Sequence, residues 1–319
     1  MRALMNWLQG LWRRYNASPR RRVLELGLIG LSFALMIRIL IASLSQINRT
    51  EIHFNFMPVP LALSAVALSV IGGTLGWSHI VRALHPDIAY TEAVRYHLLS
   101  VAAKYFPGFG WQQVSKMIQL NRSGVSLKSS ALPVALELSL LIVSGFFVAF
   151  FCIISLPMQV NLFSTQSILV LGLCALGAII LAPLLATRWV VLHHQSETPN
   201  QGYVRILLNL FISELLLAVS WICLGAGLWF TSLIFYNTPD YNFGYFVLTT
   251  IISFMVSLAV IFVPNGFGIR EVTLTLLLQV IIPEAAAVAC ALMFRFIIVL
   301  VEVACLSPVP FLMRRKRSM

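Results

Sequence analysis

The stretch from Leu127 to Cys152 reads LKSSALPVALELSLLIVSGFFVAFFC and holds only two charged residues, Lys128 and Glu137. An apolar run of about 18 or more residues with so few charges is long enough to cross the hydrocarbon core of a bilayer as a helix. Five further runs of this kind lie at about 23–46, 57–80, 165–187, 204–230 and 285–309. The sequence therefore predicts an all-α polytopic membrane protein with about six full spans.

The composition agrees with a membrane class. Of 319 residues, 59% are hydrophobic and 10% are charged, whereas an ordinary soluble domain has about 25% charged residues. No polar connection between the runs is long enough to hold a soluble domain with a core of its own. We predict a basic amphipathic N-terminal segment at 1–22, a single transmembrane domain at 23–312 with repeat halves at about 57–152 and 204–309, and a basic tail at 313–319.

Two more apolar stretches, about 89–121 and 242–282, are each interrupted near the middle. The first is interrupted by Pro107-Gly108-Phe109-Gly110, and the second by Pro264-Asn265-Gly266-Phe267-Gly268. A Pro followed closely by Gly-Phe-Gly is common to both, which makes a weak internal repeat. We predict that each stretch is a re-entrant or broken helical hairpin.

The basic residues predict the orientation of the chain, because short cytoplasmic loops are enriched in Lys and Arg. If each long run crosses the membrane once, 15 basic residues lie on the cytoplasmic side and only Arg49 lies outside. This distribution requires that each interrupted stretch returns to the side from which it enters, the first from the cytoplasm and the second from outside. The result is an inverted repeat with both termini cytoplasmic, an architecture of many secondary transporters.

The two interruptions also predict a binding site. Backbone groups that a Pro/Gly break leaves unpaired cannot face lipid, and a helix that starts after a break presents N–H groups suited to an anion. Lys104 precedes the first break, and Arg270 and Glu271 follow the second. We expect a phosphate group to bind there. The candidate substrate-binding residues are Lys104, Pro107, Gly108, Gly110, Glu137, Pro264, Asn265, Gly266, Gly268, Arg270, Glu271, Arg295 and Glu302.

Several ionisable residues lie inside predicted spans, among them Glu137, Glu214, Arg295 and Glu302. Such residues are costly in a bilayer and must be paired or face a cavity. Arg295 and Glu302 are seven residues apart and therefore share a helix face. These charges either hold helices together as structural ion pairs or serve the phosphate site, and the sequence leaves both readings open.

Other features have structural readings. Gly72 and Gly76 form a small-xxx-small pattern that is typical of close helix packing. Trp77 fits a membrane-interface position. His97 lacks the spacing of a metal ligand, and the Gly-Phe-Gly turns are not nucleotide-binding fingerprints. We expect no metal, cofactor or nucleic-acid partner, and no catalytic residues.

Three short stretches carry a resemblance: Lys104-Tyr105-Phe106-Pro107-Gly108-Phe109-Gly110-Trp111, Val263-Pro264-Asn265-Gly266-Phe267-Gly268-Ile269-Arg270-Glu271 and the later Phe294-Arg295-Phe296. Together they resemble the lysylphosphatidylglycerol synthase transmembrane family. That family includes the membrane half of MprF-type proteins and stand-alone YbhN-like bacterial inner-membrane proteins. The resemblance covers about residues 20–312 and implies a lipid-translocating domain. MprF-type proteins that make the lysyl-lipid have a soluble aminoacyl-transferase domain after the membrane part, so we expect this chain not to be a complete synthase.

The leading hypothesis is a flippase or transporter of an anionic phospholipid or a polyprenyl-phosphate-linked lipid in the bacterial inner membrane. The phosphate would contact Lys104, Arg270 and Arg295, while Glu271, Glu302 or Glu137 would balance the charge and protonation of one of them would couple transport to a proton gradient. A membrane-embedded lipid-modifying transferase, for aminoacyl or glycosyl transfer, is one alternative. An accessory subunit of a partner glycosyltransferase or lipid-biosynthesis enzyme is another.

Overall fold

The computed structural model describes residues 54–105, 110–156, 177, 179–188, 199–236, 243–259 and 268–306. Within these ranges the chain is helical and contains no strand, as predicted. The predicted span at 23–46, both termini and five predicted site residues lie outside the described residues. Those five are Pro107, Gly108, Pro264, Asn265 and Gly266.

Four described helices are long and apolar enough to cross a membrane. They are α3 (Val59–Leu84), α6 (Leu127–Ser155), α8 (Pro199–Phe235) and α11 (Glu284–Leu306), and they match the predicted spans at 57–80, 127–152, 204–230 and 285–309. A shorter apolar helix, Ile179–Arg188, covers the end of the predicted span at 165–187. At about 1.5 Å per residue, the 37 residues of α8 extend about 55 Å, well beyond the hydrocarbon core of about 30 Å.

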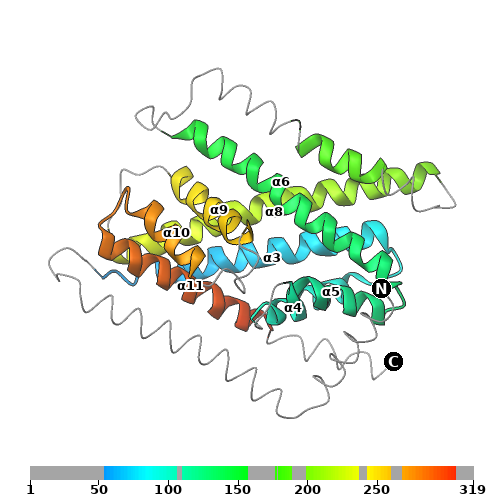
Figure 1. The fold of residues 1–319 in the computed structure, drawn as a ribbon, viewed down its shortest axis with the longest axis horizontal. Helices are drawn as coiled ribbons and strands as arrows, with labels where there is room; N and C mark the ends of the chain where they lie inside the picture. The colour runs from blue at the N-terminus through cyan, green and yellow to red at the C-terminus, as the bar shows by residue number, and fades with distance from the viewer. Residues whose placement is uncertain are drawn as a thin grey trace, which may run out of the picture.

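The two interrupted stretches form pairs of short helices, as predicted. The first pair is α4 (Tyr90–Ala103) with α5 (Trp111–Arg122), and the second is α9 (Phe243–Ala259) with α10 (Ile269–Leu278). The longest of them, α9, has 17 residues and extends about 26 Å, which is short of the hydrocarbon core. The helices within each pair pack against each other, and the two pairs lie toward opposite ends of the molecule's long axis (Figure 1).

A glycine in a rare backbone conformation precedes the second helix of each pair. Gly110 has φ +77° and precedes α5, while Gly268 has φ +82° and precedes α10. Residues with a Cβ rarely adopt positive φ, so glycine is favoured where the chain must turn into these helices. The repeated glycine of the sequence motif therefore has a repeated conformational role.

The helices α3 and α8 form the most extensive helix–helix contact of the described chain. A Cβ at Gly72 would lie 3.1 Å from the backbone oxygen of Leu216, and one at Gly76 would lie 3.4 Å from that of Ser213. These distances are close to or below ordinary contact, so the glycines permit the approach of the two backbones. The predicted packing role of Gly72 and Gly76 is confirmed.

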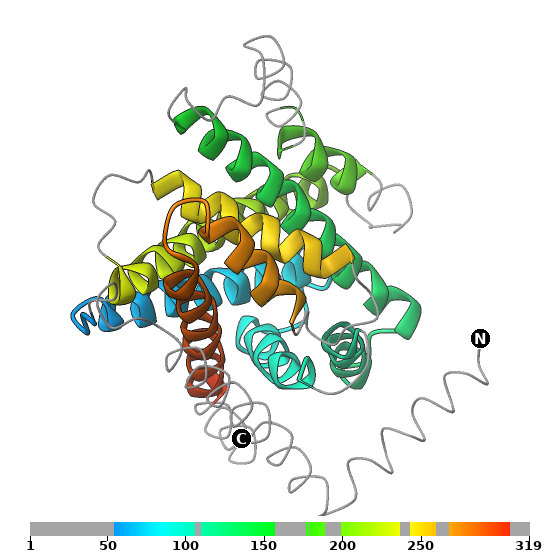
Figure 2. The same cartoon turned by 60° about the vertical axis from the view of Figure 1, so that its left-hand side comes forward.

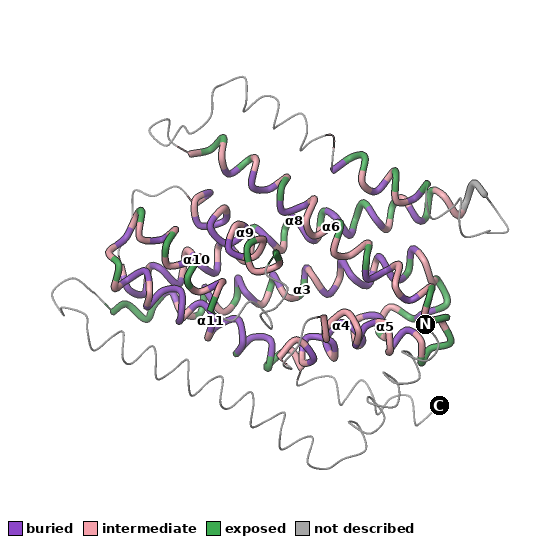
Figure 3. The backbone as a smooth tube through the Cα atoms, in the orientation of Figure 1, coloured by how far each residue is buried: buried purple, intermediate pink, exposed green. Residues whose placement is uncertain are grey.

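Burial distinguishes the inner helices from the outer surface (Figure 3). Helix α11 crosses beside α3 and α10, as the turned view of Figure 2 shows, and is largely buried. Helices α6 and α8 expose several large apolar side chains. Those exposed on α8 include Phe211, Leu215, Val219 and Ile222. Apolar side chains on the outside are what a lipid environment requires.

Candidate functional site

Helix α11 forms ion pairs with both interrupted helix pairs. Glu302 accepts hydrogen bonds from Lys104 Nζ, just after α4, and from the hydroxyl of Tyr105. Seven residues earlier on the same face, Arg295 Nε lies 3.3 Å from Glu271 Oε1 in the first turn of α10. Two pairs of residues that are far apart in the sequence are thus brought together on one helix.

Arg270 lies close to this set. It is 7% exposed, and its guanidinium lies over the ring of Phe254, 5.2 Å from the ring centroid. Its Nε and Nη2 have no hydrogen-bond partner among the described residues. The charge of Arg270 is close enough to those of Arg295, Glu271 and Glu302 to interact with them.

We call Lys104, Arg270, Glu271, Arg295 and Glu302 the charged cluster. It contains three cations and two carboxylates, so its formal charge is +1. A net positive charge at membrane depth is unfavourable unless an anion neutralises it. The cluster is therefore electrostatically suited to a ligand with one negative charge.

Glu271 already occupies the start of α10. Its Oε2 accepts a hydrogen bond of 2.7 Å from the backbone N–H of Gly268, while its Oε1 faces Arg295. A carboxylate at a helix N-terminus is stabilised by the helix dipole and by the unpaired N–H groups there. The position predicted for an external anion at this helix is thus taken by a side chain of the protein itself.

A second buried ion pair joins α5 to α6. Lys116, 2% exposed, donates to both carboxylate oxygens of Glu137 at 2.6 Å, and its ammonium lies 4.5 Å from the ring centroid of Trp77. His97 Nδ1 lies 3.5 Å from Glu137 Oε1. Glu137 therefore balances Lys116, while the other two glutamates expected to balance the cations, Glu271 and Glu302, pair with cations of the charged cluster.

The placement of Trp77 at a membrane interface was wrong. Trp77 is fully buried, and its indole N–H donates to the backbone oxygen of Ala93 at 3.1 Å. Helix α4 covers this side of α3, so the tryptophan forms part of the wall that supports Lys116. Position near the end of an apolar run cannot distinguish a belt residue from one that a neighbouring helix covers.

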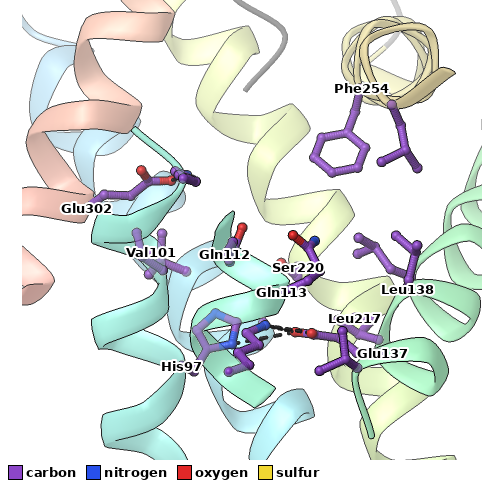
Figure 4. Close-up of a pocket in the computed structure, with 17 residues that line it drawn as sticks. His97, Val101, Gln112, Gln113, Glu137, Leu138, Leu217, Ser220, Phe254 and Glu302 are labelled. Atoms are coloured by element: carbon purple, nitrogen blue, oxygen red, sulfur yellow. Dashed lines mark hydrogen bonds and ion pairs between the residues drawn. The ribbon is translucent and has the colours of Figure 1, made fainter. Parts of the chain in front are cut away.

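A cavity of about 210 Å³ connects the two groups of charges. Lys104 and Glu302 line one side and Lys116, Glu137 and His97 another, and in Figure 4 Gln112 and Gln113 lie between Glu302 and Glu137. Phe254 lines it as well, so the ring on which Arg270 stacks faces the cavity, whereas Arg270, Glu271 and Arg295 are not among the lining residues. The volume corresponds to several water molecules of about 30 Å³ each, enough for a lipid headgroup but not for acyl chains.

The first turn of α5 forms part of the cavity wall. Its N-cap residue, Gly110, provides no side-chain cap, and the first turn contains no acidic residue. Gln112 and Gln113 in this turn line the cavity. The positive end of α5 therefore points toward the same space as Lys104, without an internal carboxylate such as Glu271 provides at α10.

The structure thus brings together the predicted residues Lys104, Arg270, Glu271, Arg295 and Glu302, and places Glu137 elsewhere on the same cavity. Sequence reasoning missed Tyr105, His97, Gln112, Gln113 and Phe254. Tyr105 and the two glutamines flank the first break, so polarity next to an intramembrane turn was a usable signal. Among the described residues, no group of three or more His, Cys, Asp or Glu side chains could hold a metal ion.

The chain matches a known protein family. The family described as the lysylphosphatidylglycerol synthase TM region matches residues 26–305, which is nearly the whole chain and includes every residue of the charged cluster. Among curated proteins, none matches this sequence.

Proposed function

Because the chain belongs to the lysylphosphatidylglycerol synthase transmembrane family, we propose that it translocates a lipid with an anionic phosphate headgroup across the bacterial inner membrane. The substrate is a phospholipid or a polyprenyl-phosphate-linked lipid. The observation that carries the proposal is the cavity between Lys104 and the first turn of α5, whose N-cap residue Gly110 supplies no side-chain cap, next to a cluster with a formal charge of +1.

The phosphate binds between Lys104 Nζ and the first turn of α5. Lys104 lies on the cavity wall and is shared with Glu302, so an incoming phosphate competes with a carboxylate for the same ammonium. Gln112 and Gln113 supply neutral donors beside it. A phosphate with one negative charge neutralises the formal charge of the cluster, whereas a zwitterionic headgroup does not.

Arg270 provides a second position for the phosphate. Its stacking partner, Phe254, faces the cavity, and its guanidinium has unpaired donors among the described residues. A change of the Phe254 rotamer exposes these donors to a headgroup in the cavity. Guanidinium groups bind phosphate with paired N–H donors, so this step would strengthen the contact.

The two interrupted helix pairs open alternately toward the two sides of the membrane. Both are tied to α11 through the Lys104–Glu302 and Glu271–Arg295 pairs, and a headgroup that binds Lys104 weakens the first tie. An inverted repeat with a site near the middle of the membrane is the arrangement that supports such alternation. The distribution of basic residues supports cytoplasmic termini.

A membrane-embedded lipid-modifying transferase, or an accessory subunit of one, is the second candidate function. The observation that favours it is the proximity of His97 to Glu137 on the cavity wall, since such a pair is suited to general base catalysis. In that case the isolated chain would alter the lipid covalently or would require a partner enzyme. In the leading proposal it moves lipid unchanged.

The test is lipid translocation in proteoliposomes with native protein, Lys104→Ala, Arg270→Ala and the control Lys128→Ala, which removes an exposed cation. Anionic and zwitterionic lipids are compared, and mass spectrometry of the recovered lipid detects covalent change. We expect the Lys104 variant to slow anionic lipid about tenfold or more, since a hydrogen bond to a charged group contributes roughly 1.5–3 kcal/mol. No movement by native protein, or equal rates for all variants, would contradict the proposal.

A further inference from the structure

One buried carboxylate takes no part in the site described above. Glu214 lies on α8, is fully buried, and both of its carboxylate oxygens lack a hydrogen-bond partner among the described residues. It is fifteen residues after the first residue of α8, which corresponds to about 23 Å along the helix. It therefore lies deep within the membrane-spanning part of the chain.

The surroundings of Glu214 are apolar. Leu210, Leu217 and Ala218, which are one turn away on the same helix face, are all buried within hydrophobic clusters. The backbone of α3 approaches this turn closely at Gly76, where a Cβ would lie 3.3 Å from Leu217 and 3.4 Å from the oxygen of Ser213. Among the described residues, Glu214 forms no ion pair.

The charged side chains of the neighbouring helices, together with His79 and Tyr245, have other partners or are exposed. His79 on α3 pairs with Asn209, and Tyr245 on α9 donates to the backbone oxygen of Leu277. Glu137 on α6 pairs with Lys116, and on α11 Arg295 pairs with Glu271 and Glu302 with Lys104. Lys128 on α6 and Glu284 on α11 are exposed. None of these groups neutralises Glu214. An ionised carboxylate without a partner in such a place would be strongly unfavourable, so the group is the neutral acid.

We propose that Glu214 is a proton-binding site through which the proton gradient drives translocation. The carboxylic acid is neutral in the closed conformation, and it loses its proton to water only when α8 and α3 separate on one side of the membrane. This step breaks the O–H bond, leaves a carboxylate and transfers the proton to the aqueous phase on that side. The coupling rests on the proposed function, whereas the protonated state of Glu214 does not.

The position of Glu214 provides the link to the lipid site. Leu217 and Ser220 on α8 line the cavity, and they follow Glu214 by three and six residues, about 4.5 and 9 Å along the helix. Ser220 also donates to the backbone oxygen of Ser69 on α3 at 2.8 Å. A separation of α3 from α8 that hydrates Glu214 thus changes the wall of the cavity in the same movement.

The test has two measurements on the reconstituted full chain. The first is modification by dicyclohexylcarbodiimide, an apolar reagent that adds to protonated carboxyl groups, followed by peptide mass spectrometry at a series of pH values. Glu284, an exposed glutamate of α11, is the matched control. At pH 7 we expect at least about tenfold more adduct at Glu214, because the reagent adds to the protonated form of a carboxyl group and Glu284 is in contact with water.

The second measurement is translocation of an anionic phospholipid with and without an imposed pH gradient, in native protein, Glu214→Gln and Glu284→Gln. Glutamine imitates the neutral acid, so we expect the Glu214 variant to fold, to lose the adduct and to lose the gradient-dependent part of the rate. Absence of the adduct from native protein at pH 7 overturns the protonated state. If native protein gives the adduct but the rate of Glu214→Gln still depends on the gradient, the coupling alone is overturned. The same holds if native protein gives the adduct but its own rate does not depend on the gradient. An adduct without any lipid movement overturns the proposed function and leaves the proton-binding site standing.

Discussion

Lys104 and Glu302 lie 198 residues apart in the sequence and form an ion pair that joins the end of α4 to α11. On the same face of α11, Arg295 contacts Glu271 at the start of α10. One helix therefore contacts the end of α4 and the start of α10, next to the two breaks, through charges that are largely buried. Any movement of either pair must exchange the partner of a buried charge, and a ligand with a phosphate group is suited to take part in that exchange.

The first prediction concerns the stability that this pair provides. Lys104→Met leaves Glu302 buried without its cation, and we expect a loss of roughly 3–5 kcal/mol in the free energy of unfolding. The double variant Lys104→Met, Glu302→Met removes both charges, and we expect it to recover most of that loss while remaining inactive in translocation. Thermal unfolding in detergent measures both effects.

Lys128→Met is the control for this comparison, since Lys128 is exposed and we expect a change within about 0.5 kcal/mol. Destabilisation in the double variant as large as that in Lys104→Met alone would contradict the coupling of the two charges.

The second prediction concerns the contact between α8 and α9. A Cβ at Gly225 would lie 2.5 Å from Val247 Cα, a distance that requires the backbones to move apart. We expect Gly225→Ala to destabilise the protein by about 1–3 kcal/mol, as other overpacked sites do. Thermal unfolding tests this, with Gly73→Ala as the matched variant, because the nearest atom to a Cβ there is Ser220 Oγ at 3.9 Å. Equal stability of the two variants would contradict the closeness of this contact.

The interrupted helices could be predicted from the sequence because their cause is local. A proline followed closely by Gly-Phe-Gly strongly disfavours a continuous helix, and the backbone groups that such a break frees cannot face lipid. Gly110 and Gly268 therefore marked the starts of α5 and α10 correctly. The residues of the charged cluster could also be identified, since ionisable groups inside apolar runs are rare and costly.

The partners of these charges could not be predicted. Spacing along a helix tells which residues share a face, as with Arg295 and Glu302, but not which neighbouring helix that face contacts. Glu137 was one of three glutamates, with Glu271 and Glu302, that were expected to balance the phosphate-binding cations, and α5 places Lys116 against it. Trp77 was misplaced for the same reason, because its burial depends on how α4 packs over α3.

The third prediction separates the two turn glycines. Gly110 has φ +77° and ψ +9°, near the left-handed helical region that asparagine tolerates, whereas Gly268 has φ +82° and ψ −47°, outside it. We expect Gly110→Asn to retain most of the native stability and Gly268→Asn to lose about 1–3 kcal/mol, the range for strained backbone. Thermal unfolding measures the difference. Gly110→Val should also lose stability, because a β-branched residue is strained at positive φ, and that loss would confirm that Gly110 has positive φ. A ranking in which Gly110→Asn is the less stable asparagine variant would contradict the assigned conformations.

The last prediction concerns Glu271, which acts as an internal substitute for the ligand's phosphate. Its carboxylate accepts the Gly268 N–H and contacts Arg295, so a headgroup that reaches α10 must displace it. Glu271→Ala frees both partners and changes the formal charge of the cluster from +1 to +2. We expect an anionic lipid to bind about tenfold more tightly, which corresponds to one charge-assisted hydrogen bond of roughly 1.5 kcal/mol, and to be released more slowly, so that turnover falls while affinity rises. Binding of a fluorescent anionic phospholipid in detergent and translocation in proteoliposomes measure the two quantities separately. Glu284→Ala, which removes an exposed carboxylate from α11, is the control and should change neither. Weaker binding in Glu271→Ala would mean that Glu271 holds the site in its binding form instead of competing for it.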